Sequence, residues 1–257
     1  MNIARIITLA KAQQSKFNAD RARLSALFYW VVFKILTVGM MSWTSVEAST
    51  AHTVIAGMIA LELMLCVAME VSWCTVRELF TKNFVNLFSS PITIYEWMAS
   101  VALMAIYPHV LVLSFSSALV YGLFGFNFFL LGWKILPLLL NYYLMGVSLG
   151  FVSSGLLMRY GTSMITYVFM ISFAFLPLSG VYYDIAIFPL VVQKFAYCLP
   201  LYYSINVLKE LVLYSTFNIK ELFIAFGLNV FYLVLAIRFF AYMFNQSRKI
   251  GLSRVER

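Results

Sequence analysis

The sequence predicts an all-α integral membrane protein with six transmembrane helices. Of its 257 residues, 63% are hydrophobic and only 11% are charged, whereas soluble domains average about half apolar and a quarter charged. Six apolar runs are each close to the roughly 20 residues that a helix needs to cross a bilayer. The mean hydropathy of +0.91 agrees with this class. The chain therefore reads as one transmembrane domain, residues 1–257, without a separate soluble domain.

The runs and their connections set out the expected organisation of the chain. We place the spans at Leu24–Val46, Val54–Val76, Trp97–Val120, Gly132–Leu157, Thr162–Gly180 and Leu222–Phe244. The resulting parts are an interfacial helix in 1–23, spans one and two in 24–76, a cytoplasmic segment in 77–96, spans three to five in 97–180, an outer segment in 181–221, span six in 222–244 and a cytoplasmic tail in 245–257.

The first twenty residues predict a basic amphipathic helix on the membrane surface. They lack the continuous apolar core of a signal peptide. Their apolar residues recur at about helical spacing between basic and amide residues, a pattern typical of interfacial helices. A frayed polar tail remains the alternative. The apolar positions are Ile3, Ile6, Ile7, Ala10 and Phe17.

The distribution of basic residues orients the chain. Cytoplasmic loops of membrane proteins carry an excess of Lys and Arg. With both termini in the cytoplasm, twelve basic residues lie on the inner side and four on the outer side, so the net charge of +8 records topology rather than nucleic-acid binding. The inner set is Arg5, Lys11, Lys16, Arg21, Arg23, Arg77, Lys82, Arg159, Arg248, Lys249, Arg254 and Arg257, and the outer set is Lys134, Lys194, Lys209 and Lys220.

The stretch Arg77–Glu96 interrupts two long apolar runs with an amphipathic, charged segment. Its apolar residues follow helical spacing and Ser90-Pro91 closes this predicted helix. Thr93 with Glu96 three residues later predicts a capping box ahead of span three. A plain loop needs only a few polar residues, so this longer segment indicates a docking surface. The residues concerned are Arg77, Glu78, Phe80, Lys82, Phe84, Leu87 and Phe88.

The outer segment 181–221 is apolar enough to suggest a seventh span, but its proline residues and charges argue against one. We expect two short re-entrant helices split near Pro200, with tyrosines at the membrane boundary. Such backbone is tolerated only where protein or a wet cavity covers it. Pro177, Gly180, Pro189 and Pro200 mark this region.

Charged residues inside spans are costly and form the next candidate site. Lys34 and Glu62 lie midway along spans one and two, at matching depth from the turn that joins them. We therefore expect them to pair, with Glu70 about two turns closer to the cytoplasm as a competitor or an extension of a polar track. The pair either sets helix register or lines a substrate path.

The remaining sequence patterns indicate helix packing and give no sign of a nucleotide-binding or metal site. Leu156 stands where a phosphate-binding loop requires Lys, so the chain has no such motif of its own. Gly146 and Gly150 form a G-x-x-x-G pair that predicts close helix packing. The three cysteines and two histidines have no ligand spacing, so no metal site is expected.

Four stretches together resemble the membrane subunits of ABC-2 type exporters. They are the surface helix, RELFTKNFVNLFSSPITIYEW, GFVSSGLLMRYG at Gly150–Gly161, and PLSGVYYDIAIFPLVVQKFAYCLPLYYSINVLKELV at Pro177–Val212. Asp184 stands where the family commonly has proline. Each motif is short, but their order within six spans makes the likeness specific.

The resemblance implies a permease half in the cytoplasmic (inner) membrane that forms a homodimer or pairs with a similar subunit. It implies two cytoplasmic ATPase subunits, which would hold ATP and Mg²⁺, while this chain would bind no cofactor and catalyse nothing. The helix Arg77–Ser89 would dock in an ATPase groove. The cargo would be amphipathic, lipid-linked, polysaccharide or drug-like. A secondary transporter or channel, and a membrane enzyme or assembly factor, remain the alternatives.

Overall fold

The computed structural model describes residues 2–45 and 48–250, and the described residues contain helices and no strand. Val46, predicted as the end of span one, and residues 251–257 of the predicted tail lie outside this range. The α-helices are α1 (Ile3–Ala19), α2 (Arg21–Lys34), α3 (Met40–Ser45), α4 (Ala48–Phe80), α5 (Phe84–Ser89), α6 (Ile94–Phe124), α7 (Ile135–Tyr160), α8 (Ile165–Ala174), α9 (Leu190–Tyr197), α10 (Pro200–Tyr214) and α11 (Ile219–Ile250).

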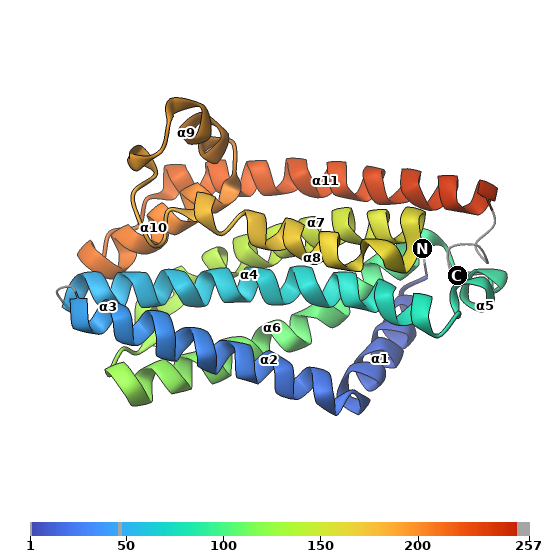
Figure 1. Ribbon diagram of the computed structural model, residues 1–257, viewed down its shortest axis with the longest axis horizontal. Helices are drawn as coiled ribbons and strands as arrows, with labels where there is room; N and C mark the ends of the chain where they lie inside the picture. Colours follow the sequence, from blue (N-terminus) through green and yellow to red (C-terminus); the bar gives the residue numbers. More distant parts are fainter. Residues whose placement is uncertain (1, 46–47, 251–257) are drawn as a thin grey trace.

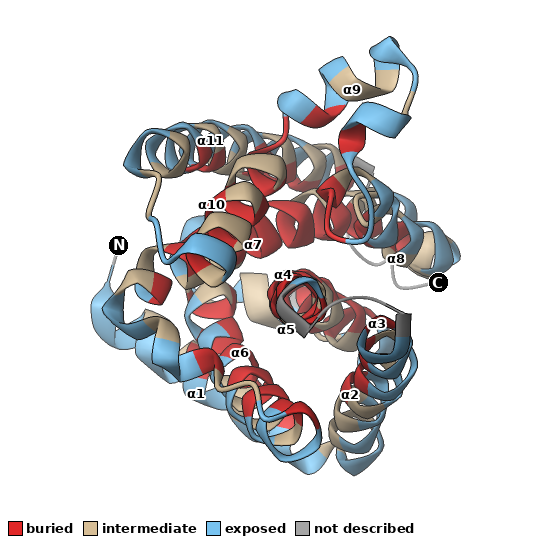
Figure 2. Cartoon of the chain, turned by 90° about the vertical axis from the view of Figure 1, so that its left-hand side faces the viewer, coloured by how far each residue is buried: buried red, intermediate tan, exposed pale blue. Residues whose placement is uncertain are grey.

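The helices surround α4, which is the central helix of the bundle (Figures 1 and 2). In its most apolar window, 83% of the α4 residues are buried, against 17% for the first and last spanning stretches. Apolar residues on all sides of α4 explain this, because a helix that is hydrophobic all round must be covered by others. α3, α6, α7, α8 and α10 provide that cover.

Five helical stretches in the described chain are long and apolar enough to cross a membrane. The fourth, Phe128–Ser179, is 52 residues long and contains the fourth predicted span and all of the fifth except Gly180. It reverses direction at Gly161, whose positive φ of 74° is readily adopted only by glycine. α7 and α8 therefore lie antiparallel and in contact, as Figure 1 shows.

The predicted fifth span, Thr162–Gly180, is not one continuous α-helix. A 3₁₀ turn, Gly161–Met164, precedes α8, and another, Pro177–Ser179, follows it. Proline at position 177 begins the second turn, and Gly180 ends it with a φ of 71°. The ten α-helical residues of α8 measure only about 15 Å.

The first span also departs from a regular α-helix. A π-helical turn, Ile35–Gly39, separates α2 from α3 and begins directly after Lys34. Gly39 faces the Phe124 ring of α6, which lies 2.8 Å from where a Cβ would stand. Such turns are rare and often occur at functional sites. Nothing in the hydrophobic pattern of this segment predicts it.

Gly146 and Gly150 bring α7 close to α4. A Cβ at position 146 would lie 2.6 Å from the Met64 carbonyl oxygen, and one at position 150 would lie 2.5 Å from Val71 Cβ. Ser154 continues the row, since its hydroxyl donates to the Val71 carbonyl at 3.3 Å. The two backbones thus approach through small residues, as expected of a G-x-x-x-G pair in a membrane protein.

Residues 181–221 contain the two short helices α9 and α10, and the helix break predicted near Pro200 is present. Pro189 precedes α9, and Pro200 is the first residue of α10, where its missing N–H costs no hydrogen bond. α10 packs on α4 and α11, while α9 projects from the bundle with a largely exposed surface (Figure 2). Lys209 of α10 donates to the Gly180 carbonyl, which ties α10 to the end of the α8 region.

The ends of the helices divide between the two ends of the bundle. α1, α5 and the last turns of α11 gather at one end, whereas α3 and α9 lie toward the other (Figure 1). This is the division expected if 1–23, 77–96 and 245–257 face the same side.

We expect Gly150→Leu to lower the midpoint of thermal unfolding in detergent. The new side chain must displace the Val71 side chain of α4, and overpacking of this kind costs about 1–3 kcal/mol. Gly122→Leu is the matched control, because a Cβ at that helical position meets nothing within 4 Å. Equal midpoints for the two variants would contradict a packing role for Gly150.

Candidate functional site

Three buried or half-buried carboxylates follow one another along α4 at intervals of eight residues: Glu62, Glu70 and Glu78. Each interval corresponds to about 12 Å along the helix. Each carboxylate forms an ion pair with a basic residue of α1 or α2, and we call the three pairs the ion-pair ladder. The pairs are Lys34–Glu62, Arg23–Glu70 and Lys16–Glu78.

The first pair is the one expected from the sequence. Lys34 Nζ donates to Glu62 Oε2, with both side chains mostly but not wholly buried. Glu70 was expected to compete for Lys34 or to extend the polar track. It instead binds Arg23, whose Nη2 lies 2.6 Å from Glu70 Oε1 and whose guanidinium lies 4.6 Å from the centre of the Trp73 ring. Glu70 therefore extends the charged track with a basic partner of its own.

A pocket of about 220 Å³ opens between α2, α4 and α8 at the first two pairs. Arg23, Lys34, Glu62 and Glu70 all line it, and Phe173 contributes from α8. The remaining wall is apolar or sulfur-bearing, including Trp30 and Cys66. Four charged groups thus face one small space, a costly arrangement in a membrane unless the charges are paired.

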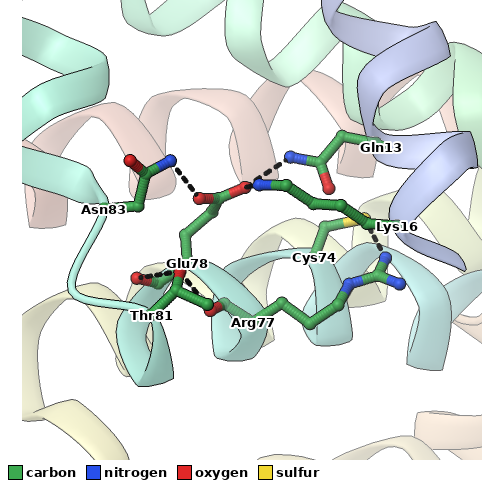
Figure 3. Close-up of polar contacts among 7 residues, drawn as sticks. All are labelled: Gln13, Lys16, Cys74, Arg77, Glu78, Thr81 and Asn83. Atoms are coloured by element: carbon green, nitrogen blue, oxygen red, sulfur yellow. Dashed lines mark hydrogen bonds and ion pairs between the residues drawn. The ribbon is translucent and has the colours of Figure 1, made fainter. Parts of the chain in front are cut away.

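Glu78 forms the third pair at the end of α4 and is 99% buried (Figure 3). Its Oε1 accepts from Lys16 Nζ at 2.5 Å and from Gln13 Nε2 at 2.8 Å, both on α1. Its Oε2 accepts from Asn83 Nδ2 at 2.8 Å, directly before α5. One carboxylate therefore joins α1, α4 and the connection to α5.

The beginning of α1 is attached to the same connection at two further points. The Asn2 amide donates to Glu96 Oε1 at 2.7 Å, and Arg5 Nη1 donates to the Pro91 carbonyl at 2.6 Å. Glu96 also completes the capping box with Thr93, so that prediction is confirmed. α1 is thus bound to the last turn of α4 near one of its ends, and to Pro91 and the first turn of α6 at the other.

The predicted helix Arg77–Ser89 is divided in the structure. α4 ends at Phe80, and Lys82 adopts a left-handed conformation with a φ of 51°. The Asn83 amide donates to the Glu78 carbonyl at 3.0 Å and the Lys82 amide to the Leu79 carbonyl at 3.1 Å. These two bonds form a Schellman motif. Glycine usually occupies the left-handed position after a helix. Because Lys82 stands there instead, the sequence contains no glycine signal for the end of α4.

The aromatic residues of this segment face the bundle rather than outward. Phe84 is buried, with its ring centre 6.1 Å from those of Phe88 and Trp97. Phe88 in turn lies 4.7 Å from the Phe244 ring of α11. Leu87 is half-buried in the same cluster. Of the four apolar residues expected in the docking surface, Phe80, Phe84, Leu87 and Phe88, only Phe80 is largely exposed, at 64%.

The end of α4 and the turn after it form an exposed surface next to α5. We call Phe80, Thr81 and Lys82 the turn tip; all three are exposed. Arg77 lies behind it and donates to Cys74 Sγ at 3.2 Å, while Glu78 is enclosed. An exposed phenyl ring beside a lysine is an arrangement suited to an apolar groove with an acidic rim.

Sequence analysis missed Gln13, Lys16, Arg23 and Asn83 as members of this site. The eight-residue spacing of the three glutamates on one predicted helix could have indicated a row of ion pairs. Basic residues in α1 and α2 occur in the reverse order along the chain, as an antiparallel partner requires. Within residues 2–45 and 48–250, no group of three metal-ligating side chains occurs.

Comparison with known families gives one result. The family described as ABC-2 type transporter matches residues 8–213. That range covers most of the chain, includes α4, α5 and α8, and ends within the last turn of α10. A search of curated proteins finds no significant match.

Glu78→Gln should loosen α1 while the rest of the bundle stays folded. The neutral amide loses the charge that Lys16 and Gln13 bind, and hydrogen bonds to charged groups contribute about 1.5–3 kcal/mol. Amide hydrogen exchange in α1 should accelerate by about tenfold or more. Lys11→Gln, in an exposed position of the same helix, should leave the rate unchanged. Unchanged exchange in Glu78→Gln would refute the attachment.

Lys34→Met should destabilise the protein by on the order of 3 kcal/mol, because it leaves Glu62 charged and without its partner. The double variant Lys34→Met/Glu62→Met should recover most of that loss, since a buried ion pair replaced by apolar residues is often neutral. Chemical or thermal unfolding measures both. A double variant as unstable as the single one would show that the two charges do not act as a pair.

Proposed function

Because this chain belongs to the ABC-2 type transporter family, we propose that it is the permease subunit of an ATP-driven exporter in the cytoplasmic (inner) membrane. The family match over residues 8–213 carries this proposal. Members of the family are membrane transport components and are not themselves catalytic. The sequence is consistent with this, since it has no phosphate-binding motif. ATP and Mg²⁺ would bind to separate cytoplasmic ATPase subunits, two for each transporter.

In the proposed topology the chain crosses the membrane six times. The first crossing comprises α2 and α3, and α4, α6, α7, α8 and α11 provide the others. The antiparallel return of α8 along α7 favours counting the 52-residue stretch as two crossings. The basic residues of 1–23, 77–96 and 245–257 favour a cytoplasmic location for both termini. α9 and α10 would then be the re-entrant helices of the outer leaflet.

The ATPase would contact the turn tip. Phe80 is the exposed apolar anchor there, and Lys82 is the exposed charge beside it. Interfaces commonly depend on a few such anchors, with aromatic residues and charges prominent among them. The enclosed residues Glu78, Phe84, Leu87 and Phe88 would act behind this surface by holding the connection rigid. α5 would therefore serve as the brace of the coupling segment rather than as its contact face.

Movement of the tip would pass to the charged pocket through α4. The tip ends α4, and Glu70 and Glu62 lie about three and five turns before it on the same helix. The ladder fixes α1 and α2 against α4, so these three helices would move together. The pocket at the first two pairs supplies a polar lining for a substrate path.

The cargo fits best as an amphipathic molecule, which includes lipid-linked, polysaccharide-bearing and drug-like substrates. The pocket combines four charged side chains with apolar walls, so it suits a molecule with both kinds of surface. A second permease copy, as a homodimer, would complete the path, with membrane lipids around it. The positive charges follow topology, and no nucleic-acid partner is proposed.

A secondary transporter or channel is the alternative function. The paired charges within the membrane favour it to some degree, because such residues also mark ion pathways. The two functions differ in their energy source. Transport by reconstituted protein that follows an ion gradient, with no ATPase bound, would support the alternative.

Phe80→Asp should release the ATPase from the purified native complex and abolish ATP-dependent transport, while leaving the midpoint of thermal unfolding of the permease unchanged. The residue is 64% exposed and serves no buried cluster. Phe129→Asp is the matched control, because that ring is 56% exposed and belongs to the connection between α6 and α7. Co-purification is the measurement. Retention of the ATPase by Phe80→Asp would contradict docking at the turn tip.

A further inference from the structure

The two ion pairs of the charged pocket differ in how far a ligand can reach them. In the Arg23–Glu70 pair the glutamate side chain is 2% exposed and its Oε2 is enclosed, while the guanidinium contacts the Trp73 ring. In the Lys34–Glu62 pair the two side chains are 23% and 14% exposed, and both line the pocket. We call Lys34–Glu62 the accessible pair.

The accessible pair has both a donor and an acceptor left for a ligand. Lys34 Nζ carries three N–H groups, and it gives one of them to Glu62 Oε2 within residues 2–45 and 48–250. Glu62 Oε1 accepts no hydrogen bond from any residue that the structure describes, and it is not enclosed as Glu70 Oε2 is. A ligand can therefore donate to Glu62 and accept from Lys34 while the pair itself stays intact.

The balance of charge in the pocket selects the kind of ligand. Two cations and two anions line the pocket, so their charges cancel. A ligand with a net charge would add an unbalanced charge among apolar side chains, which is costly. A ligand with one ammonium and one acidic group adds none. With its ammonium beside Glu62 and its acidic group beside Lys34, each charge would have opposite charges as its nearest neighbours.

The size and the open side of the pocket suit a headgroup whose apolar part stays outside. The volume of about 220 Å³ lies below the range of about 300–1,000 Å³ that is typical of sites for drug-sized ligands. Trp30 and Phe173 line the pocket and are 54% and 41% exposed, so both rings lie at its open side. A hydrocarbon chain can leave past these rings along the exposed apolar surface of α2, which includes Phe33.

We propose that the charged pocket binds the headgroup of a zwitterionic amphiphile, in which an ammonium group donates to Glu62 Oε1 and a phosphate group accepts from Lys34 Nζ. A phosphate offers several acceptor oxygens to the N–H groups that Lys34 has left. The inference rests on the exporter function proposed above in taking this molecule as the cargo, but the binding itself needs neither ATP nor an ATPase. It narrows the cargo to amphipathic molecules that carry one cation and one anion.

Native mass spectrometry of the full chain in detergent, without an ATPase, tests this selectivity. Three lipids with the same two oleoyl chains are compared: phosphatidylethanolamine, which is zwitterionic, phosphatidylglycerol, which is anionic, and a cationic lipid with a primary amine. The first phosphatidylethanolamine should bind about tenfold more tightly than either other lipid. Equal affinities would overturn the proposal. Displacement of the lipid by free phosphoethanolamine at the same concentration would also overturn it, because the ligand would then be a water-soluble zwitterion.

Neutral variants of the accessible pair should reverse the headgroup preference. Glu62→Gln leaves one excess positive charge in the pocket, so phosphatidylglycerol should become the tightest lipid. Lys34→Gln leaves one excess negative charge, so the cationic lipid should bind most tightly. Lys11→Gln removes an exposed charge of α1 and should keep the preference for phosphatidylethanolamine. If the pair were only structural, both variants would weaken the three lipids alike, and that result would contradict the proposal.

A filling variant tests the site even if a charge variant does not fold. Ala26 lines the pocket and is exposed on α2, so Ala26→Trp fills the space without displacing a buried side chain, and it should remove the preference. Ala22→Trp is the control, because Ala22 is exposed about one turn earlier on α2 and outside the pocket wall. A preference that survives Ala26→Trp would place the lipid elsewhere and overturn the proposal.

The outcomes separate this inference from the exporter function. Absence of a headgroup preference in a chain that still co-purifies with an ATPase would refute the inference alone. A clear preference for phosphatidylethanolamine in a chain that binds no ATPase would support the headgroup site and refute the exporter function alone.

Discussion

The ion-pair ladder is the constraint on which the arrangement of the N-terminal half depends. A carboxylate on a helix surrounded by apolar side chains is unfavourable unless a cation meets it. α4 carries three such carboxylates, so α1 and α2 must lie where Lys16, Arg23 and Lys34 can reach them. The spacing along α4 thereby sets both the direction and the register of the first two helices. Hydrophobic burial alone would leave that register free, because lipid is as apolar as the helix surfaces.

The ion-pair ladder also connects α1, α2 and α4 along most of the length of α4. At the Glu78 end of the ladder, the carboxylate binds both α1 and Asn83, and the Schellman motif beside it fixes the direction in which the chain leaves α4. At the Glu62 end, the charged pocket opens next to the π-helical turn of the first span. A rigid α4 joins the two ends, and close contact with α7 at Gly146 and Gly150 prevents it from moving independently of the bundle core.

Helix class, the Lys34–Glu62 pair, the capping box and the break near Pro200 could all be predicted from the sequence. Each depends on a signal that is visible in the sequence. Composition predicts the helices, matched depth predicts the ion pair, the three-residue spacing predicts the capping box, and proline predicts the break. The inward orientation of Phe84 and Phe88 could not, because an amphipathic pattern shows that one face is apolar but not what covers it. The end of α4 was hidden by a lysine in a position where glycine is usual. Gln13 and Lys16 belong to the site only through tertiary contact with a residue more than sixty positions away.

α8 separates two spaces of opposite character. Phe173 lines the charged pocket. Ile171 and Phe175 line an apolar cavity of about 440 Å³ between α7, α8 and α11, so the two sides of one short helix border spaces of different polarity. Two glycines with positive φ, Gly161 and Gly180, flank it. A displacement of α8 would enlarge one space at the expense of the other. Molecules occupying the two spaces would therefore influence each other reciprocally without ever touching, through the position of a ten-residue helix.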